Sequence, residues 1–220
     1  MIEFNDQQKN KIKSLKPLTE SKFLYNKSKW KGLLINFLKE IEDFENKEIS
    51  RQNIIDAYKE YFEDNSKSYM KAFLLTMVWG FADTGYGTFR TNKYISNKQN
   101  ISSIKTALDY INEDNRYSLK KAFESLLEIN GLGISYLTKI LYFATRAKKS
   151  TDYALIFDIR VSTALVKLTT PKEVYNIVSI GPSSKFKDYE LFNKMIHKLA
   201  NDNNVDADQV EMYLFNQDFE

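Results

Sequence analysis

The chain has 220 residues, with 43% hydrophobic and 28% charged side chains and a formal net charge of +3. These values are typical of a soluble globular protein of one or two domains. The absence of cysteine excludes disulfides, thiolate metal sites, thiolate-bound iron–sulfur clusters and cysteine nucleophiles, and a single histidine, His197, argues against a histidine zinc site or a Ser-His-Asp triad. No apolar stretch is long enough to span a bilayer, and no signal-peptide pattern opens the chain, so we expect a cytoplasmic, intracellular protein.

Only seven glycines and three prolines occur, which favours long helices over a β-sandwich or barrel. Residues 1–19 are rich in lysine and weakly periodic, and we expect a basic arm or a partly mobile tail. Further along, apolar residues spaced by three and four predict amphipathic helices over residues 30–41, 73–81, 137–144 and 191–199. The same template predicts about nine to eleven helices in all. The fold class is therefore all-α.

One group of glycines lies among aromatic residues, between Trp79 and Tyr94. Aromatic rings stack on extruded bases, and aspartate or arginine can read a base edge. The segment is therefore a tentative base pocket, formed by Trp79, Asp83, Tyr86 and Arg90. The alternative is a packed loop in which Arg90 pairs with Asp83 and the aromatic rings join the core.

The second group of glycines, Gly131 and Gly133, separates two amphipathic patterns. We expect Ser118 to cap the first helix and the second helix to run from about Ile134 to about Lys148. A Gly-Leu-Gly turn before a helix exposes backbone N–H groups that favour an anion, which indicates a phosphate clamp. A plain C-cap glycine followed by a new helix is the alternative.

Residues 154–157 are apolar, and we expect a short extended entry to a helix over residues 159–168. Asp158 stands at the start of that helix. Aspartate is a favoured N-cap residue, which gives Asp158 a structural role whatever else it does.

These two segments occur in a characteristic order. The chain has Leu126-Leu127-Glu128-Ile129-Asn130-Gly131-Leu132-Gly133 and, after a helix and a loop, Leu155-Ile156-Phe157-Asp158-Ile159-Arg160-Val161. Across residues 117–168 the sequence resembles the helix-hairpin-helix DNA glycosylase superfamily. It looks most like bacterial proteins with an 8-oxoguanine DNA glycosylase-like fold, also through residues 79–91.

The resemblance implies two helical subdomains with an active-site cleft between them. Residues 50–150 would form the central subdomain, ending in the helix-hairpin-helix at about 117–148. Residues 151–220 would form the C-terminal subdomain carrying Asp158, and the N-terminal helices of residues 1–49 would pack with it.

The resemblance also implies catalysis by Asp158, whose carboxylate would stabilise the oxocarbenium-like sugar or activate its attacker. Relatives that also nick the strand carry a nucleophilic lysine two residues after the second hairpin glycine, where this chain has Ser135. Lys139 follows one turn later on the same helix face. With Ser135 in that position we expect base excision with little strand cleavage. If Lys139 reaches the sugar, we expect a covalent intermediate and a nicked product.

The expected function is therefore that of a DNA N-glycosylase, with at most weak lyase activity, that flips and excises a damaged or modified base, 8-oxoguanine being the first guess. The expected partner is double-stranded DNA with a modified base, and the protein is expected to be monomeric, with no membrane association. No cofactor is expected beyond a monovalent cation at the hairpin. The alternatives are a non-catalytic DNA-binding module that uses the hairpin as a phosphate clamp, and a helical protein-interaction domain. The expected DNA contacts are Gly131, Leu132, Gly133, Ile134, Ser135, Tyr136 and Arg160.

Overall fold

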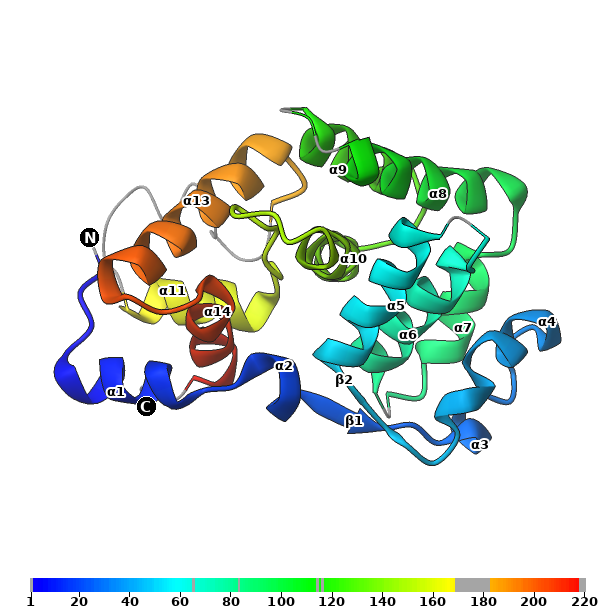
Figure 1. Cartoon of the computed structure of the whole chain (residues 1–220), viewed down its shortest axis with the longest axis horizontal. Coiled ribbons are helices and arrows are strands. Elements are labelled where there is room, and N and C mark those ends of the chain that lie inside the picture. The colour runs from blue at the N-terminus through cyan, green and yellow to red at the C-terminus, as the bar shows by residue number, and fades with distance from the viewer. Residues whose placement is uncertain are drawn as a thin grey trace.

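A computed structural model describes residues 2–64, 66–82, 84–113, 115, 117–168 and 183–217. The prediction of an all-α fold is confirmed, since helices dominate these residues (Figure 1). In chain order the elements are α1 (Asp6–Ser14), α2 (Pro17–Glu20), β1 (Lys22–Leu24), α3 (Lys27–Trp30), α4 (Ile35–Leu38), the 3-10 helix η1 (Lys39–Phe44), β2 (Glu48–Ser50), α5 (Arg51–Glu63), α6 (Tyr69–Phe81), α7 (Gly87–Tyr94), α8 (Lys98–Glu113), α9 (Ser118–Leu127), α10 (Ile134–Ala147), α11 (Ile159–Leu168), α13 (Phe186–Asn203) and α14 (Ala207–Asn216).

Helix α10 lies in the middle of the molecule, with α5 and α6 on one side and α11 and α13 on the other (Figure 1). It packs against α5, α6 and α9. Every residue from Leu137 to Thr145 is buried. A helix that is covered all round can hold a side chain at a fixed position inside the protein, which is the condition for a rigid site.

The prediction of one helix over residues 30–41 is wrong. The chain forms α3, α4 and η1 there, and Leu34 is 48% exposed instead of facing the core. The side chain of Asn92 on α7 explains the break, because its Nδ2 donates to the Gly32 carbonyl at 2.8 Å and its Oδ1 accepts from the Leu34 amide at 3.2 Å. These bonds use backbone groups that a continuous helix would have paired internally.

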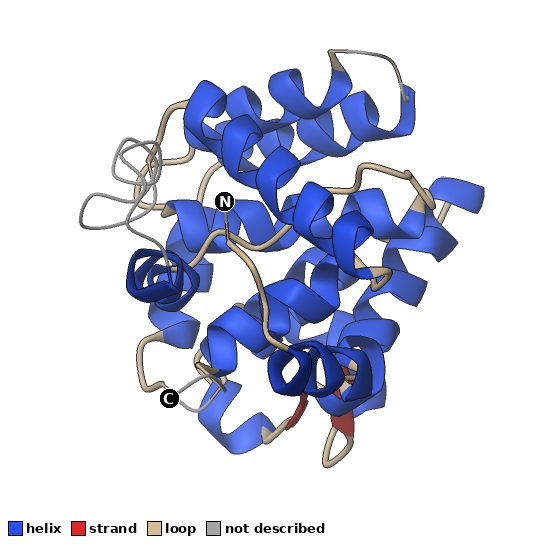
Figure 2. Ribbon diagram, turned by 90° about the vertical axis from the view of Figure 1, so that its left-hand side faces the viewer, coloured by secondary structure: helices blue, strands red, loops and turns tan. Residues whose placement is uncertain are grey.

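A small sheet was not predicted. Strands β1 and β2 pair antiparallel with Phe23 opposite Ile49, and they lie at one edge of the helical molecule (Figure 2). Strands of three residues carry too little alternation for a periodic pattern to reveal them.

The expectation of an arm or mobile tail at residues 1–19 is also wrong. Asn5 and Gln8 form a capping box at the start of α1, and Ile12 is fully buried. The Gln209 side chain on α14 donates to the Leu15 carbonyl at 2.9 Å, so α14 holds the residue that follows α1. Helices α1 and α2 both contact α14, whereas α4 and η1 contact α6.

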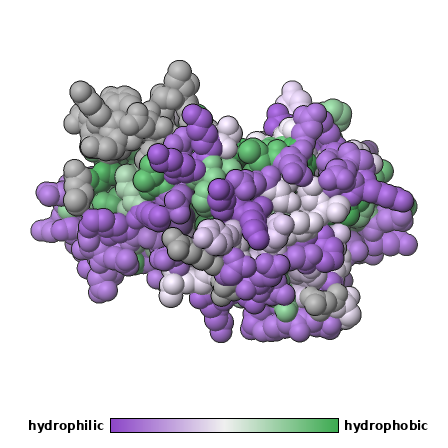
Figure 3. Space-filling model, turned by 90° about the horizontal axis from the view of Figure 1, so that it is seen from above, coloured by the Kyte–Doolittle hydropathy of each residue, from purple (hydrophilic) through white to green (hydrophobic). Residues whose placement is uncertain are grey.

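None of the described helices is long and apolar enough to cross a membrane. Hydrophilic side chains dominate the face seen from above (Figure 3).

Candidate active site

The turn between α9 and α10 gives the site its backbone. Gly131 adopts φ +85°, a conformation that favours glycine, and its carbonyl accepts a hydrogen bond of 3.0 Å from the Tyr94 hydroxyl. Gly133 is extended and caps α10. The predicted bounds of α10 are confirmed to within one residue. Ser118 is not the N-cap of α9 but its first residue, and its hydroxyl accepts from the Asn115 amide instead.

The first turn of α10 carries backbone donors that the protein itself leaves unused. The amides of Ile134 and Ser135 donate no hydrogen bond within the described part of the chain, as is usual for the first residues of a helix. Lys93 on α7 reaches the same turn, with its Nζ 3.2 Å from where a side chain on Gly131 would begin. Sequence reasoning missed Lys93, because nothing local relates it to a turn so far along the chain.

The segment before α11 forms neither helix nor strand over residues 153–158, and α10 holds it in place. The Thr138 hydroxyl accepts from the Phe157 amide at 3.0 Å, and the Thr145 hydroxyl accepts from the Ala154 amide at 2.9 Å. Phe157 also stacks on Phe192 of α13 with ring centroids 4.3 Å apart. These two threonines lie on one face of α10 and bind the backbone of the segment through hydrogen bonds. Asp158 therefore lies beside the first turn of that helix.

The two carboxylate oxygens of Asp158 have separate partners. Oδ1 accepts from the Arg160 amide at 3.0 Å, as expected of a residue that caps α11. Oδ2 accepts from the Ser135 hydroxyl at 2.5 Å. Capping therefore uses one oxygen and leaves the other facing α10.

Lys139 completes a three-residue cluster. Its Nζ donates to Ser135 Oγ at 2.6 Å and lies 3.5 Å from Asp158 Oδ2. The side chains of Lys139 and Asp158 are only 8% and 15% exposed, so this is a largely desolvated ion pair. The structure thus brings together the three residues expected to be catalytic: Ser135, Lys139 and Asp158.

Burial and charge set the ionisation of the pair. Burial lowers the pKa of Lys139 below its ordinary value, although the charges of Asp158 and Glu211 oppose this change. Burial alone would raise the pKa of Asp158, but the Lys139 charge and the hydrogen bonds from Ser135 and the Arg160 amide outweigh it and hold that pKa below its ordinary value. Asp158 is therefore a carboxylate at neutral pH.

The end of α6 forms the wall behind the lysine. Gly80 has no side chain, and a Cβ there would lie 3.1 Å from both Lys139 Cδ and a ring carbon of Tyr136. Phe81 stacks on the Tyr136 ring at 4.1 Å, and Lys139 Nζ lies 5.0 Å from the centre of that ring. Gly80 is a functional candidate that sequence reasoning noted only as part of a glycine group.

The residues expected to form a base pocket lie in different environments. Trp79 donates from Nε1 to the Ser21 carbonyl and packs against Arg51 and Phe143. Tyr86 is 72% exposed, and Asp83 lies outside the described residues.

Arg90, expected in the base pocket, and Arg160, expected to contact DNA, are both exposed. Arg90 interacts with the Tyr94 hydroxyl, and its charge acts on Tyr136, so it lies at the edge of the cluster. Arg160 is exposed and lies over the Phe215 ring at 4.5 Å. Within the hairpin, by contrast, the Leu132 side chain is buried, so only its backbone is available for contact.

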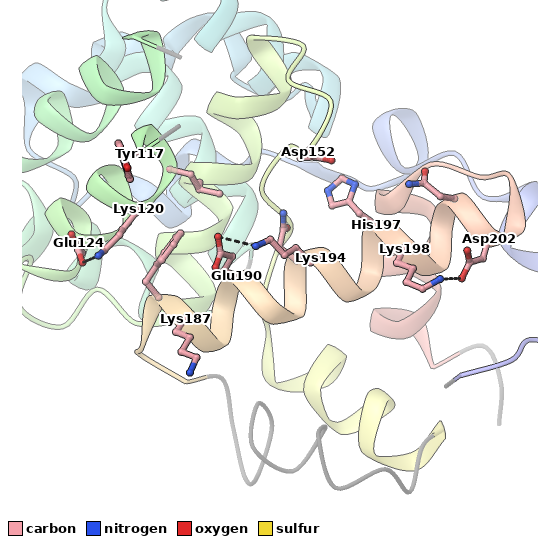
Figure 4. Close-up of a pocket in the computed structure, with 14 residues that line it drawn as sticks. Tyr117, Lys120, Glu124, Asp152, Lys187, Glu190, Lys194, His197, Lys198 and Asp202 are labelled. Atoms are coloured by element: carbon pink, nitrogen blue, oxygen red, sulfur yellow. Dashed lines mark hydrogen bonds and ion pairs between the residues drawn. The ribbon is translucent and has the colours of Figure 1, made fainter. Parts of the chain in front are cut away.

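A groove of about 1100 Å³ lies elsewhere, between the start of α9 and α13 (Figure 4). Its lining charges are mostly paired with each other, as in Lys194–Glu190 and Lys198–Asp202. His197 points into it and contacts the Tyr153 carbonyl at 2.8 Å. This groove contains none of the three clustered residues. The part of the chain that the structure describes contains no group of three or more metal-ligating side chains.

The fold and the cluster define a helical protein with a desolvated lysine–carboxylate pair beside a glycine turn. Residues 16–215 match the family described as "Putative 8-oxoguanine DNA glycosylase OGG-like protein", and the chain belongs to that family. No curated protein and no solved structure matches it.

Proposed function

We propose that the chain is a DNA glycosylase that extrudes a damaged or modified base from duplex DNA and hydrolyses its N-glycosidic bond, with 8-oxoguanine as the first substrate to test. The observation that carries the proposal is the contact of Ser135, Lys139 and Asp158 beside the Gly131–Gly133 turn. Membership of the family supports it.

Asp158 has the properties that the reaction needs. Cleavage of the bond between the base and C1′ leaves a sugar with oxocarbenium character, which a nearby carboxylate stabilises. The base leaves with the bonding electron pair and takes up a proton from solvent. Water then attacks C1′ and passes its proton to the carboxylate. The carboxylate is charged at neutral pH because Lys139 and Ser135 stabilise its anion.

Ser135 and Lys139 act on that carboxylate in this proposal. The Ser135 hydroxyl accepts from Lys139 and donates to Asp158, so it fixes the direction of Oδ2. Lys139 is almost covered, and Ser135 contacts its Nζ directly. We therefore assign Lys139 to charge stabilisation and expect base excision to exceed strand cleavage. Its lowered pKa makes the amine easier to deprotonate than a surface lysine, so a trapping experiment belongs in the test.

The turn is the proposed place where the DNA backbone docks. The unused amides of Ile134 and Ser135 and the Lys93 ammonium offer donors to one phosphate. In this proposal α9, the turn and α10 form the helix-hairpin-helix, and a monomer binds along the minor groove. The division into residues 1–49, 50–150 and 151–220, with the site in the cleft between two subdomains, is part of the same proposal.

The test is a labelled duplex panel carrying 8-oxoguanine, uracil, alkylated purines and modified cytosines. Each reaction is split into untreated and alkali-treated halves. Breaks that appear only after alkali indicate base hydrolysis and identify the substrate, whereas breaks without alkali that borohydride traps indicate attack by Lys139. Binding without release of any base would contradict the proposal and favour a DNA-binding module without chemistry.

A further inference from the structure

The outer face of α7 carries two aromatic and two basic side chains in one row. Tyr86, Phe89, Arg90 and Lys93 are spaced by three, one and three residues, which places them on one side of a helix. We call these four residues the α7 stripe. All four are exposed, and Tyr86 and Phe89, at 72% and 71%, are the most exposed aromatic side chains in the described part of the chain.

The fold does not require the α7 stripe. Helix α7 is fixed through its other faces, where Gly87 packs against Trp30 and Phe81 and the Thr88 hydroxyl donates to the Lys29 carbonyl at 3.1 Å. Asn92 makes the two bonds to residues 32 and 34 described above. Two large exposed rings thus have no structural explanation in the described chain, and exposed apolar surface of this kind marks a binding face.

The basic end of the stripe leads to the candidate active site. Lys93 Nζ lies at the Gly131 turn, and Arg90 interacts with Tyr94, whose hydroxyl bonds the Gly131 carbonyl. Tyr86 stands just before the first residue of α7, at the other end. With about 1.5 Å of rise per residue, the stripe is roughly 10 Å long. A strand of stacked duplex DNA advances about 3.4 Å per nucleotide and an unstacked strand advances further, so the stripe spans at most about three nucleotides.

We propose that the α7 stripe binds a DNA strand whose bases are unstacked, with Tyr86 and Phe89 stacking on bases and Arg90 and Lys93 contacting phosphates. The inference rests on the proposed function, because it makes the stripe an extension of the catalytic site. Exposed rings next to cations form the usual surface for unstacked nucleic acid. The stripe carries two positive charges and no carboxylate, which suits a polyanion better than a protein partner. In this proposal Tyr86 contacts the strand outside the base pocket.

The test measures binding and needs neither a lesion nor catalysis. The full chain is titrated onto a labelled duplex of ordinary bases with a central three-nucleotide bubble, and onto the fully paired duplex of the same length. We expect tighter binding to the bubble. Tyr86→Ser with Phe89→Ser should weaken bubble binding at least tenfold, because each stacked base contributes strongly, and should leave paired-duplex binding within about twofold. Tyr117→Ser, which changes an exposed tyrosine beside α9, is the matched control and should bind as the wild type does.

Salt dependence tests the charged half of the stripe. Arg90→Gln with Lys93→Gln should reduce the slope of log affinity against log salt by about 1.4, since each phosphate contact on a single strand contributes about 0.7. Equal binding of the wild type to bubble and paired duplex would overturn the inference, as would wild-type affinity of the double aromatic variant with an unchanged melting temperature. If the aromatic effect is present but no base is ever released, the inference stands and the proposed chemistry fails.

Discussion

Lys139 and Asp158 form an ion pair across two helices, with Nζ and Oδ2 3.5 Å apart and both side chains largely buried. A buried pair is costly to assemble, because both ions lose their hydration. The pair lies beside a turn whose two glycines, Gly131 and Gly133, are exposed. We attribute the pair to function.

The first prediction concerns the acid limb of the reaction. The pKa of Asp158 in the folded protein lies below its ordinary value of 3.8, so its carboxylate form persists down to a lower pH than that of a free aspartate. Lys139→Met removes the charge that opposes burial and must raise this pKa. We expect the acid limb of single-turnover base release to move to higher pH in the variant. A limb at the same pH in both proteins would show that Lys139 does not act on Asp158.

The second prediction uses the close packing at Gly80. Gly80→Ala places a methyl group 3.1 Å from Lys139 Cδ and Tyr136, and the shift of a catalytic group by a fraction of an ångström costs about ten- to a hundredfold in rate. Stability should change little, since the helix preference of alanine over glycine, about 1 kcal/mol, offsets the cost of the tight contact. Gly85→Ala is the control, because nothing lies within 4 Å of its new methyl group. Equal rates of base release by both variants would show that Gly80 does not position the catalytic residues.

The third prediction separates the two hairpin glycines. Gly131→Ala should destabilise the protein by roughly 1–2 kcal/mol, since φ is +85° there. Gly133→Ala meets no neighbour and has φ −70°, so its stability should fall by no more than about 1 kcal/mol, the usual cost of alanine at an N-cap. Its methyl group nevertheless lies where a phosphate is expected, and we predict weaker DNA binding. If Gly133→Ala binds DNA with wild-type affinity in a titration, the DNA does not contact this turn.

The fourth prediction concerns the ion pair behind the site. Arg51 Nη1 and Glu211 Oε2 are 2.7 Å apart and almost fully buried, and Arg51 lies between the rings of Trp79 and Tyr142. Removing one partner leaves the other charge buried without a counter-ion and should lower the free energy of unfolding by about 3–5 kcal/mol. The double variant Arg51→Met with Glu211→Leu should lose much less stability than the two single variants lose together. Urea unfolding of the four proteins measures this, and additive losses would contradict it.

The sequence predicts the parts of the site that depend on local pattern. Helix α10, the extended entry and the position of Asp158 at a helix start follow from spacing and capping preference alone. The order of the two motifs then brought Ser135, Lys139 and Asp158 into one hypothesis.

What the sequence did not predict depends on contacts between distant residues. The break in residues 30–41 comes from Asn92, whose bonds reach 60 residues back to Gly32. Trp79 faces Arg51, and Lys93 reaches Gly131, neither of which has a sequence signal. The exposure of Tyr86 and Phe89 likewise depends on which face of α7 the rest of the chain covers.

The most direct measurement is single-turnover release of free base from the best substrate of the panel, by the wild type and by Asp158→Asn. We expect a loss of at least a hundredfold in the variant, with DNA affinity unchanged within about twofold. Asp152→Asn, which alters an exposed aspartate, should keep the wild-type rate. Base release by Asp158→Asn at the wild-type rate would show that this carboxylate does not carry the reaction.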